Sequence, residues 1–565
     1  MTKHEIAREW LIAHRDDMVA FASRLCAIPS YKQPPVPGAA FGEDCRIVLD
    51  VALAHARDLG LDTQRVEEFG GVAMTAATDA DGFVLMTHLD VVPAQPDDWV
   101  SPPFAPEVRG GWLYARGAVD NKGPAVASLY AVAALKAAGV SLNRQVQVFF
   151  GTDEESGWND LPAYCAVHQL PREGIAPDGC FPVINAEKGI AWLEAEWTVP
   201  AAGIDVIASG TAANVVPDSA QAVVNGKKLS WTGRAAHGSH PELGDNAAVK
   251  MAQDLVNNYT IGENLNNVLD FISRSNGRGD QLGLACADVS GALTMNVGEV
   301  KYDGQTARVV VDIRVPVTHD LDAVIAKWCE LVAQRDGKAK VINRQAPLYL
   351  PAEDPLIRKL VGVWRNHGGE GPELMAIGGG TYARALERGV AFGPVDHDAG
   401  LCAHQPNEKI ALEDLYRLAD ILLDVLVEVC GEESPEKRVE RQSEVWGQLQ
   451  KQAESKAAQK TFVFGALGLA SFALSVILFL FTGAFSDNLL VGKLLAPMSF
   501  GAFVLAMAFG GMAISRGKKA KGLDGVNRQK AKNGFVLGII TLVGAVPIFL
   551  AGAILLLWVF LRLFE

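Results

Sequence analysis

The stretch NRQVQVFFGTDEESGW, residues 143–158, joins a strand pattern to a cluster of acids. Its apolar run at residues 146–150 predicts a buried strand. Three acids follow that strand, namely Asp153, Glu154 and Glu155. Neighbouring carboxylates repel one another unless a proton or a cation lies between them. The stretch therefore indicates a sheet with an acidic, cation-binding cluster at the end of one strand.

Other segments before residue 430 also have acids or histidines next to a predicted strand or helix. The strand pattern of GFVLMTHLDVVP ends at His88 and Asp90, and the strand pattern of FPVINAEKG begins just after Asp178. Asp120 stands in a turn before a helical pattern that runs from about residue 122 to residue 138. Alternating strand and helix patterns indicate an α/β sheet, and such sheets gather their sites at strand ends. We expect these polar side chains to converge.

Two imidazoles and several carboxylates would then meet in one pocket. Taken singly, these residues have plain structural explanations, such as a buried core histidine, a helix cap or a solvent-exposed acid pair. The set consists of His88, Asp90, Asp120, Glu154, Glu155, Asp178 and, in the late block CAHQPNE, His404. Together they suit a pair of divalent cations, with zinc first and cobalt or manganese next.

Seven short blocks of the sequence are similar to the signature blocks of one enzyme family. They are MTHLDVVP, GAVDNKGP, GTDEESGW, PDGCFPVINAEKG, AAHGSHP, GGGTYAR and AHQPNE. In this order, over roughly residues 5–430, they resemble the co-catalytic zinc metallopeptidases. That family includes carboxypeptidase G, acetylornithine deacetylase, succinyl-diaminopimelate desuccinylase and carnosinase. Three of the blocks resemble the bacterial dipeptidase V branch most.

The resemblance implies an α/β fold of the zinc-exopeptidase kind, with a mixed sheet and flanking helices. Residues 1–188 and 346–432 would form the catalytic domain, and residues 189–345 an inserted α+β lid domain. In dimeric relatives the lid pairs two subunits and lends a histidine to the other site, whereas the enlarged lid of dipeptidase V serves its own site. This lid is longer than the minimal kind, which favours a self-sufficient site and leaves a homodimer open.

The resemblance also implies the ligands of two zinc ions. His88, Asp120 and Asp178 would bind one ion. Asp120, Glu155 and His404 would bind the other, so that Asp120 bridges both.

Three further features of this centre are implied in the same way. The Asp120–Asn121 peptide is cis in relatives. Asp90 would accept the free N–H of His88 and so fix its tautomer. Glu154 would bind no metal and would act as the general base for a hydroxide that bridges the two zinc ions.

Blocks in the lid and near the end of the catalytic domain imply how substrate is held. His237 would stabilise the oxyanion, Asn214 and Arg314 would contact substrate, and the loop AIGGGTYARAL would open a helix whose N–H groups cradle a carboxylate. The loop residues concerned are Gly379, Gly380 and Thr381.

Arg314 has a structural alternative, an ion pair with a neighbouring acid. We expect His240 to be a surface residue. His397 competes with His404 as a ligand, but only His404 precedes QPNE.

The last part of the chain has a different composition. Residues 461–481, 494–514 and 534–561 are apolar and long enough to be three transmembrane helices. The loop between the second and third holds seven Lys/Arg and one acid, which predicts a cytoplasmic loop and a cytoplasmic catalytic domain at the cell (inner) membrane. The start of the chain lacks a secretory pattern, which agrees with this expectation. The polar stretch 433–460 predicts a solvated helical stalk, with a weak heptad as the alternative.

Charge separates the two parts as well. The last 105 residues carry nine bases and three acids, a net charge of +6, so the formal charge of −14 leaves −20 for residues 1–460. So acidic a body argues against nucleic acid as a partner.

The sequence thus predicts a membrane-anchored metal-dependent hydrolase that cleaves dipeptides or short peptides with a free C-terminal carboxylate. The first alternative is an N-acyl-amino-acid amidohydrolase with the same two metals. A metal-free binding module and a small channel formed by the tail are further alternatives. Neither is favoured, because the ligands and the base are all present and the spans lack charges inside the membrane.

Overall fold

The computed structural model describes residues 1–78, 81–200, 203–397 and 402–432, together with the isolated tail residues 463, 466, 467, 470, 508, 533 and 536. The chain divides into two compact units, Met1–Glu432 and Glu433–Glu565. The predicted stalk and, apart from those isolated positions, the three predicted membrane spans lie outside the described residues. Within the described residues, no helix is both long and apolar enough to cross a bilayer.

The first unit contains a nine-stranded mixed sheet. Its order is β1-β2-β6-β3-β7-β21-β9-β19, with β20 paired to β9. The strands are β1 (Asp62–Val66), β2 (Gly70–Met74), β3 (Phe83–His88), β6 (Val146–Gly151), β7 (Glu173–Ala176), β9 (Val183–Glu187), β19 (Leu348–Tyr349), β20 (Leu374–Ile377) and β21 (Arg388–Phe392). β3 runs parallel to β6 and β7, whereas β2 runs antiparallel to β6. The predicted mixed sheet is confirmed.

Both faces of this sheet are covered, as the continuous apolar pattern of β3 requires. Phe83 and Leu85 pack into one hydrophobic core, and Val84 and Met86 pack into the opposite one. The larger core is covered by α1 (Lys3–Ala13), α2 (Arg15–Cys26), α3 (Glu43–Asp58), α4 (Lys122–Ala137), α9 (Pro355–Asn366) and α10 (Leu412–Cys430). The smaller core is covered by α5 (Asp160–Cys165) and the 3₁₀ helix η4 (Tyr382–Ala385).

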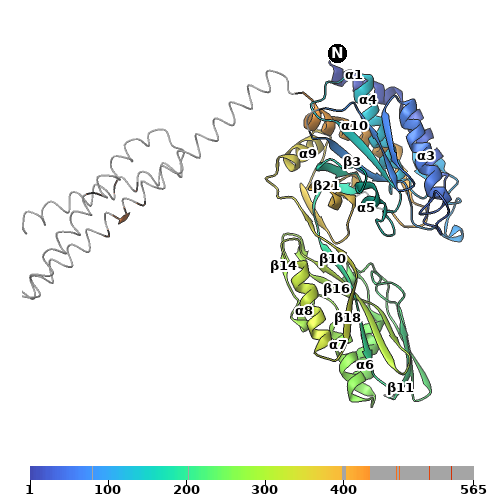
Figure 1. Ribbon diagram of the computed structural model, residues 1–565, viewed down its shortest axis with the longest axis vertical. Helices are drawn as coiled ribbons and strands as arrows, with labels where there is room; N and C mark the ends of the chain where they lie inside the picture. The colour runs from blue at the N-terminus through green and yellow to red at the C-terminus, as the bar shows by residue number, and fades with distance from the viewer. Residues whose placement is uncertain are drawn as a thin grey trace, which may run out of the picture. The chain divides into compact units, whose positions relative to one another are not determined.

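Helix α4 occupies the centre of the larger layer. It packs against α10, α1 and α2 and against strands β3 and β6 (Figure 1). Its many alanines let these neighbours approach closely, and it is buried from Lys122 to Leu135. Because α4 starts directly after Asp120 and Asn121, this packing fixes the turn that carries both residues.

Residues between β9 and β19 form a second sheet, which we call the lid. Its seven strands are all antiparallel, in the order β13-β12-β11-β16-β17-β10-β18. They are β10 (Gly189–Thr198), β11 (Ile204–Ser209), β12 (Ser219–Val224), β13 (Lys227–Thr232), β16 (Thr294–Tyr302), β17 (Thr306–Val315) and β18 (Lys338–Gln345). Helices α6 (Ala247–Asn258), α7 (Glu263–Arg274) and α8 (Leu321–Ala333) pack on it around a core of its own (Figure 1).

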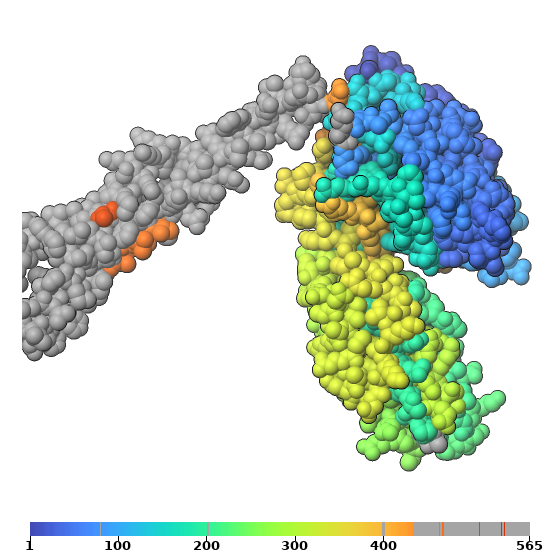
Figure 2. All heavy atoms as spheres, viewed as in Figure 1, coloured from blue at the N-terminus to red at the C-terminus, as the bar shows by residue number. Residues whose placement is uncertain are grey.

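The chain returns from the lid to the first sheet. In the space-filling view, yellow to orange residues that follow the lid pack against blue and teal residues that precede it (Figure 2). The remaining elements are short: η1 (Pro96–Asp98), β4 (Glu107–Arg109), β5 (Trp112–Tyr114), β8 (Gly179–Phe181), η2 (Pro241–Leu243), η3 (Asp280–Leu282), β14 (Ala287–Asp288), β15 (Gly291–Ala292), β22 (Pro394–Asp396) and β23 (Lys409–Ala411).

Candidate active site

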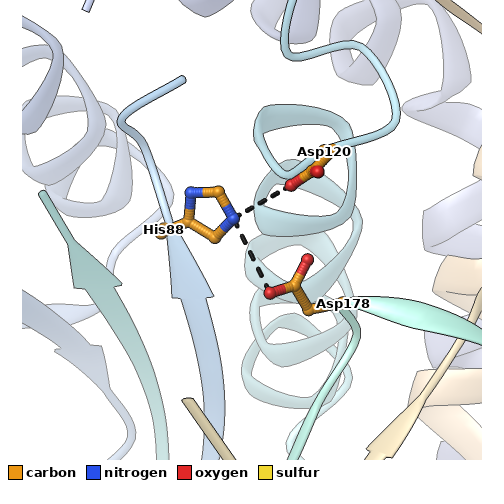
Figure 3. Close-up of side chains that lie close together, drawn as sticks. All are labelled: His88, Asp120 and Asp178. Atoms are coloured by element: carbon orange, nitrogen blue, oxygen red, sulfur yellow. Dashed lines mark hydrogen bonds and ion pairs between the residues drawn. The ribbon is translucent and has the colours of Figure 1, made fainter. Parts of the chain in front are cut away.

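The first group of side chains that could hold a metal ion is His88, Asp120 and Asp178 (Figure 3). His88 ends β3, Asp120 precedes α4, and Asp178 lies between β7 and β8. The Nε2 atom of His88 is 3.1 Å from an oxygen of Asp120 and 3.7 Å from an oxygen of Asp178. Its Nδ1 atom lies 3.0 Å from the carbonyl oxygen of Asp90. An Nδ1–H that donates to this carbonyl leaves Nε2 free for a metal ion.

The second group is Asp120, Glu155 and His404. The Nε2 atom of His404 lies 3.0 Å from an oxygen of Asp120 and 3.0 Å from an oxygen of Glu155. Asp120 faces His88 with Oδ1 and His404 with Oδ2, so it stands between the two groups. The peptide bond from Asp120 to Asn121 is cis, as the resemblance implied.

The ligand types fit two divalent cations. Each group offers one imidazole nitrogen and two carboxylates, and the ligand atoms within a group lie within 4.8 Å of one another. Imidazole and carboxylate together suit zinc, cobalt or manganese.

Burial and neighbouring charges shift the pKa values of these side chains. Burial and the charge of Asp120 raise the pKa of Glu155 to about 7. Burial lowers the pKa of His404, but hydrogen bonds with Asp120 and Glu155 outweigh it and raise that pKa to about 11. Burial likewise raises the pKa of Asp178. Metal binding would displace such protons, since the ligands must be deprotonated.

Glu154 belongs to neither group. Burial raises the pKa of its carboxyl group well above the usual range, and the charges of Asp178 and Glu155 act in the same direction against that of His88. Within the part of the chain that the structure describes, this carboxyl group makes no hydrogen bond. A buried carboxyl with a raised pKa is suited to take and return a proton near neutral pH.

Comparison with known proteins agrees with this geometry. Residues 84–428 match the model of peptidase family M20/M25/M40. The chain belongs to this family. A Bacillus subtilis (strain 168) protein named "Putative dipeptidase YtjP" is 32% identical over 455 residues, which cover 72% of this chain and 96% of that protein. The predicted peptidase is thereby confirmed, as a metal-dependent hydrolase of peptides.

Two solved structures share the fold. The dipeptidase Dug1p of Saccharomyces cerevisiae has a TM-score of 0.51 at 13% identity, covering 76% of this chain and 99% of that one. The aminoacylhistidine dipeptidase of Vibrio alginolyticus has a TM-score of 0.51 at 15% identity, covering 74% and 96%.

Asp90 supports this M20 site differently from the sequence expectation. Its carboxylate accepts the backbone N–H groups of Glu154, at 3.1 Å, and Glu155, at 3.0 Å. The carboxylate stands 3.4 Å from Nδ1 of His88, farther than the carbonyl oxygen of the same residue. Asp90 therefore contacts His88 mainly through its main chain, while its side chain fixes the turn that carries the two glutamates.

Two supporting residues had no role in the sequence interpretation. Glu408, buried and paired with Arg116 at 2.6 Å, accepts the backbone N–H groups of Val119 and Asp120. Asn121 donates to Asp178 at 3.0 Å. The signals were present, because Glu408 ends the block AHQPNE and Asn121 follows the bridging position.

His237 lies in the lid, between β13 and η2. Its Nδ1 atom is 2.7 Å from the hydroxyl of Ser239 and accepts the Ser239 backbone N–H at 3.3 Å. Burial lowers the pKa of His237 to about 4, and the charges of Arg314, His240 and His404 act in the same direction. The imidazole is therefore neutral at pH 7 and carries its proton on Nε2, where it can donate. Asn214 is half-buried, and its carboxamide bonds to no group in the described chain.

Arg314 adopts the structural alternative. Its guanidinium donates to both carboxylate oxygens of Asp312, at 2.7 and 2.6 Å, and to the carbonyl oxygen of Gly378 at 2.8 Å. It is only 3% exposed. Arg314 therefore joins the lid to the glycine-rich loop, and its contact with substrate stays a prediction.

The glycine-rich loop opens a 3₁₀ helix, where the sequence predicted a helix without fixing its kind or length. A single 3₁₀ turn, η4, follows Thr381. The backbone N–H and the hydroxyl of Thr381 donate to the buried carboxylate of Glu187, at 3.1 and 2.8 Å. In this structure the Thr381 N–H is thus occupied. By contrast, the N–H groups of Gly379 and Gly380 donate to no group among the described residues.

Two further histidines, His240 and His397, are surface residues. His240 is exposed and pairs with Glu242 at 3.2 Å. His397 is exposed and belongs to neither group of metal-ligating residues found in the described chain.

Proposed function

We propose that this M20 peptidase is a dipeptidase that binds two zinc ions, with cobalt or manganese as substitutes, and cleaves short peptides with a free C-terminal carboxylate. The observation that carries the proposal is the position of Asp120. One of its carboxylate oxygens faces His88 and the other faces His404, which supports two cations that share this residue.

Different groups would have different roles at the scissile peptide bond. When bound, the cations would acidify a water molecule and polarise the substrate carbonyl. Glu154 would take the proton of the attacking water and return it to the departing amine. The Asp90 carboxylate, by holding the Glu154 N–H, would keep that carboxyl group in place.

The lid and the glycine-rich loop would bind the oxyanion and the C-terminal carboxylate of the substrate. The neutral imidazole of His237 would donate from Nε2 to the developing oxyanion, a role supported by its lowered pKa. The N–H groups of Gly379 and Gly380 would receive the C-terminal carboxylate, assisted by Asn214 and, if it exchanges partners, Arg314.

A panel of alanyl dipeptides tests the proposal. Free, N-acetylated and C-amidated forms would be incubated with the purified protein, with and without a chelator. We expect cleavage of the free dipeptide alone, lost with chelator and restored by zinc. Cleavage of the acetylated compounds alone would replace the dipeptidase with the amidohydrolase.

We further propose that the apolar segments after residue 460 anchor the enzyme in the inner membrane. The basic loop between the second and third segments supports a catalytic domain on the cytoplasmic side. Protease protection of vesicles of known orientation tests this topology. Pairing of two chains through the lid or the polar stretch 433–460 is an additional proposal, tested by the mass of the detergent-solubilised protein.

A further inference from the structure

A cavity of about 470 Å³ lies where the lid meets the first sheet. Its walls come from lid loops around Ser239, Asn276 and Ser290, from Lys188 at the start of the lid, and from Gly378 after β20. Sites for small molecules commonly have about 300–1,000 Å³. This cavity therefore has room for a side chain of the substrate.

Two contacts connect the cavity to the residues proposed to hold substrate. Ser239 lies 2.7 Å from the Nδ1 atom of His237, and the carbonyl oxygen of Gly378 accepts a hydrogen bond from Arg314 at 2.8 Å. Ser239 and Gly378, both in the cavity wall, are therefore each in direct contact with a candidate substrate-binding residue. A peptide with its C-terminal carboxylate at the glycine-rich loop would have the side chain of its last residue beside this cavity.

Lys188 gives the cavity a buried positive charge. The residue is 9% exposed, and its ammonium group donates to the carbonyl oxygen of Ala292 at 2.6 Å. An ammonium group has three N–H donors. The nearby acid Asp288 is already bound by Ser290 and Thr318. Among the described residues, no carboxylate pairs with Lys188.

Arg278 adds a second cation at the exposed side of the cavity. It makes no hydrogen bond or ion pair with the described residues. The one acid of the lining, Glu242, is exposed and lies 3.2 Å from Nδ1 of His240. The buried amide oxygen of Asn276 has no donor, and a rotated amide would present N–H instead. The lining thus offers two cations, Lys188 and Arg278, against a single acid, Glu242.

We infer that this cavity is the subsite for the side chain of the substrate's C-terminal residue, and that Lys188 and Arg278 make it select an acidic side chain. The inference rests on the proposed dipeptidase function. It adds a preference that the two metal-binding groups do not determine.

Three dipeptides test it on the zinc-loaded full-length protein. Ala-Glu and Ala-Gln have nearly the same shape and differ in charge, while Ala-Leu reports general dipeptidase activity. We expect kcat/KM for Ala-Glu to exceed that for Ala-Gln by about 10-fold to 100-fold, mainly through KM, because a charged hydrogen bond replaces a neutral one.

Variants then locate the preference. Lys188→Met and Arg278→Ala should each reduce the ratio of Ala-Glu to Ala-Gln hydrolysis, and Arg278 is exposed enough for its variant to fold. Arg274→Ala, an exposed lid arginine outside the cavity, is the control and should keep the ratio.

The outcomes separate the two proposals. Cleavage of Ala-Leu and Ala-Gln without a preference for Ala-Glu would overturn the inference alone, as would a preference that survives in both variants. Failure to cleave any of the three would overturn the dipeptidase function and the subsite together.

Discussion

Glu408 accepts the backbone N–H of Asp120 at 3.2 Å. The two residues are 288 positions apart, yet this contact holds the main chain of the residue shared by both metal-binding groups. Glu408 in turn is held by Arg116 at 2.6 Å, and neither side chain is exposed by more than 3%. The position of Asp120 therefore depends on a buried ion pair that binds no metal itself.

Glu408→Gln should weaken metal binding without removing a ligand. The amide keeps an acceptor for the Asp120 N–H but loses the charge that holds Arg116. Changes to groups that support metal ligands typically reduce metal affinity by about 10–100-fold. Calorimetric titration with zinc measures the effect. The exposed Glu370, without a partner in the described chain, gives the control Glu370→Gln. Unchanged affinity in Glu408→Gln would exclude this supporting role.

Metal content should distinguish the shared ligand from the others. Asp120→Ala removes a ligand from both groups, so we expect no tightly bound metal after dialysis. His88→Ala and His404→Ala each damage one group, and each should retain about one ion per chain, against the two ions proposed for the wild type. Elemental analysis of the dialysed proteins gives these numbers. Equal metal content in all three variants would contradict a bridging Asp120.

The central elements of the fold could be predicted because their signals are local. The apolar run before Gly151 and the alanine-rich pattern after Asn121 depend on residues adjacent in sequence, and β6 and α4 form there. The convergence of His88 and Asp178 also follows from a general rule, since both lie at ends of neighbouring strands.

The remaining features depend on contacts that no local pattern records. Thr381 is bound by Glu187, 194 positions away, and the glycine-rich motif alone does not fix the 3₁₀ kind of the turn that follows. Arg314 and Asp312 are two positions apart on β17, so both side chains lie on the same face of the strand. The sequence left the ion pair and the substrate contact as alternatives, and only the three-dimensional structure shows which partner Arg314 has.

A cluster around Asp424 should make stability depend on pH. Its carboxylate contacts His4 at 2.6 Å, Arg8 at 2.7 Å and His367 at 2.8 Å, which ties α1 and α9 to α10. Burial opposes the effect, but hydrogen bonds from His367 and His4 and the charge of Arg8 lower the pKa of Asp424 to about 2. An unfolded aspartate titrates near 3.9.

Because the folded pKa is the lower one, this contribution is present above about pH 4 and is lost as the pH falls towards 2. We expect Asp424→Asn to lower the free energy of unfolding by about 2 kcal/mol at pH 6, and by progressively less at pH 4 and pH 3. Urea unfolding at the three pH values measures this. The exposed Asp280→Asn is the control. A constant difference between wild type and Asp424→Asn would refute the assigned cause.

Glu154 and Glu155 are adjacent in sequence, yet their variants should fail for different reasons. Glu155 belongs to a metal-binding group and Glu154 does not, although Asp90 holds the N–H groups of both. Glu154→Gln should therefore keep the wild-type metal content and lose about 10²–10⁴-fold in kcat, since an amide cannot take a proton from water. Glu155→Gln should lose metal, and added zinc should restore part of its activity. Measurements of kcat and bound zinc on both proteins separate the two roles. Wild-type turnover by Glu154→Gln would show that another group acts as the base.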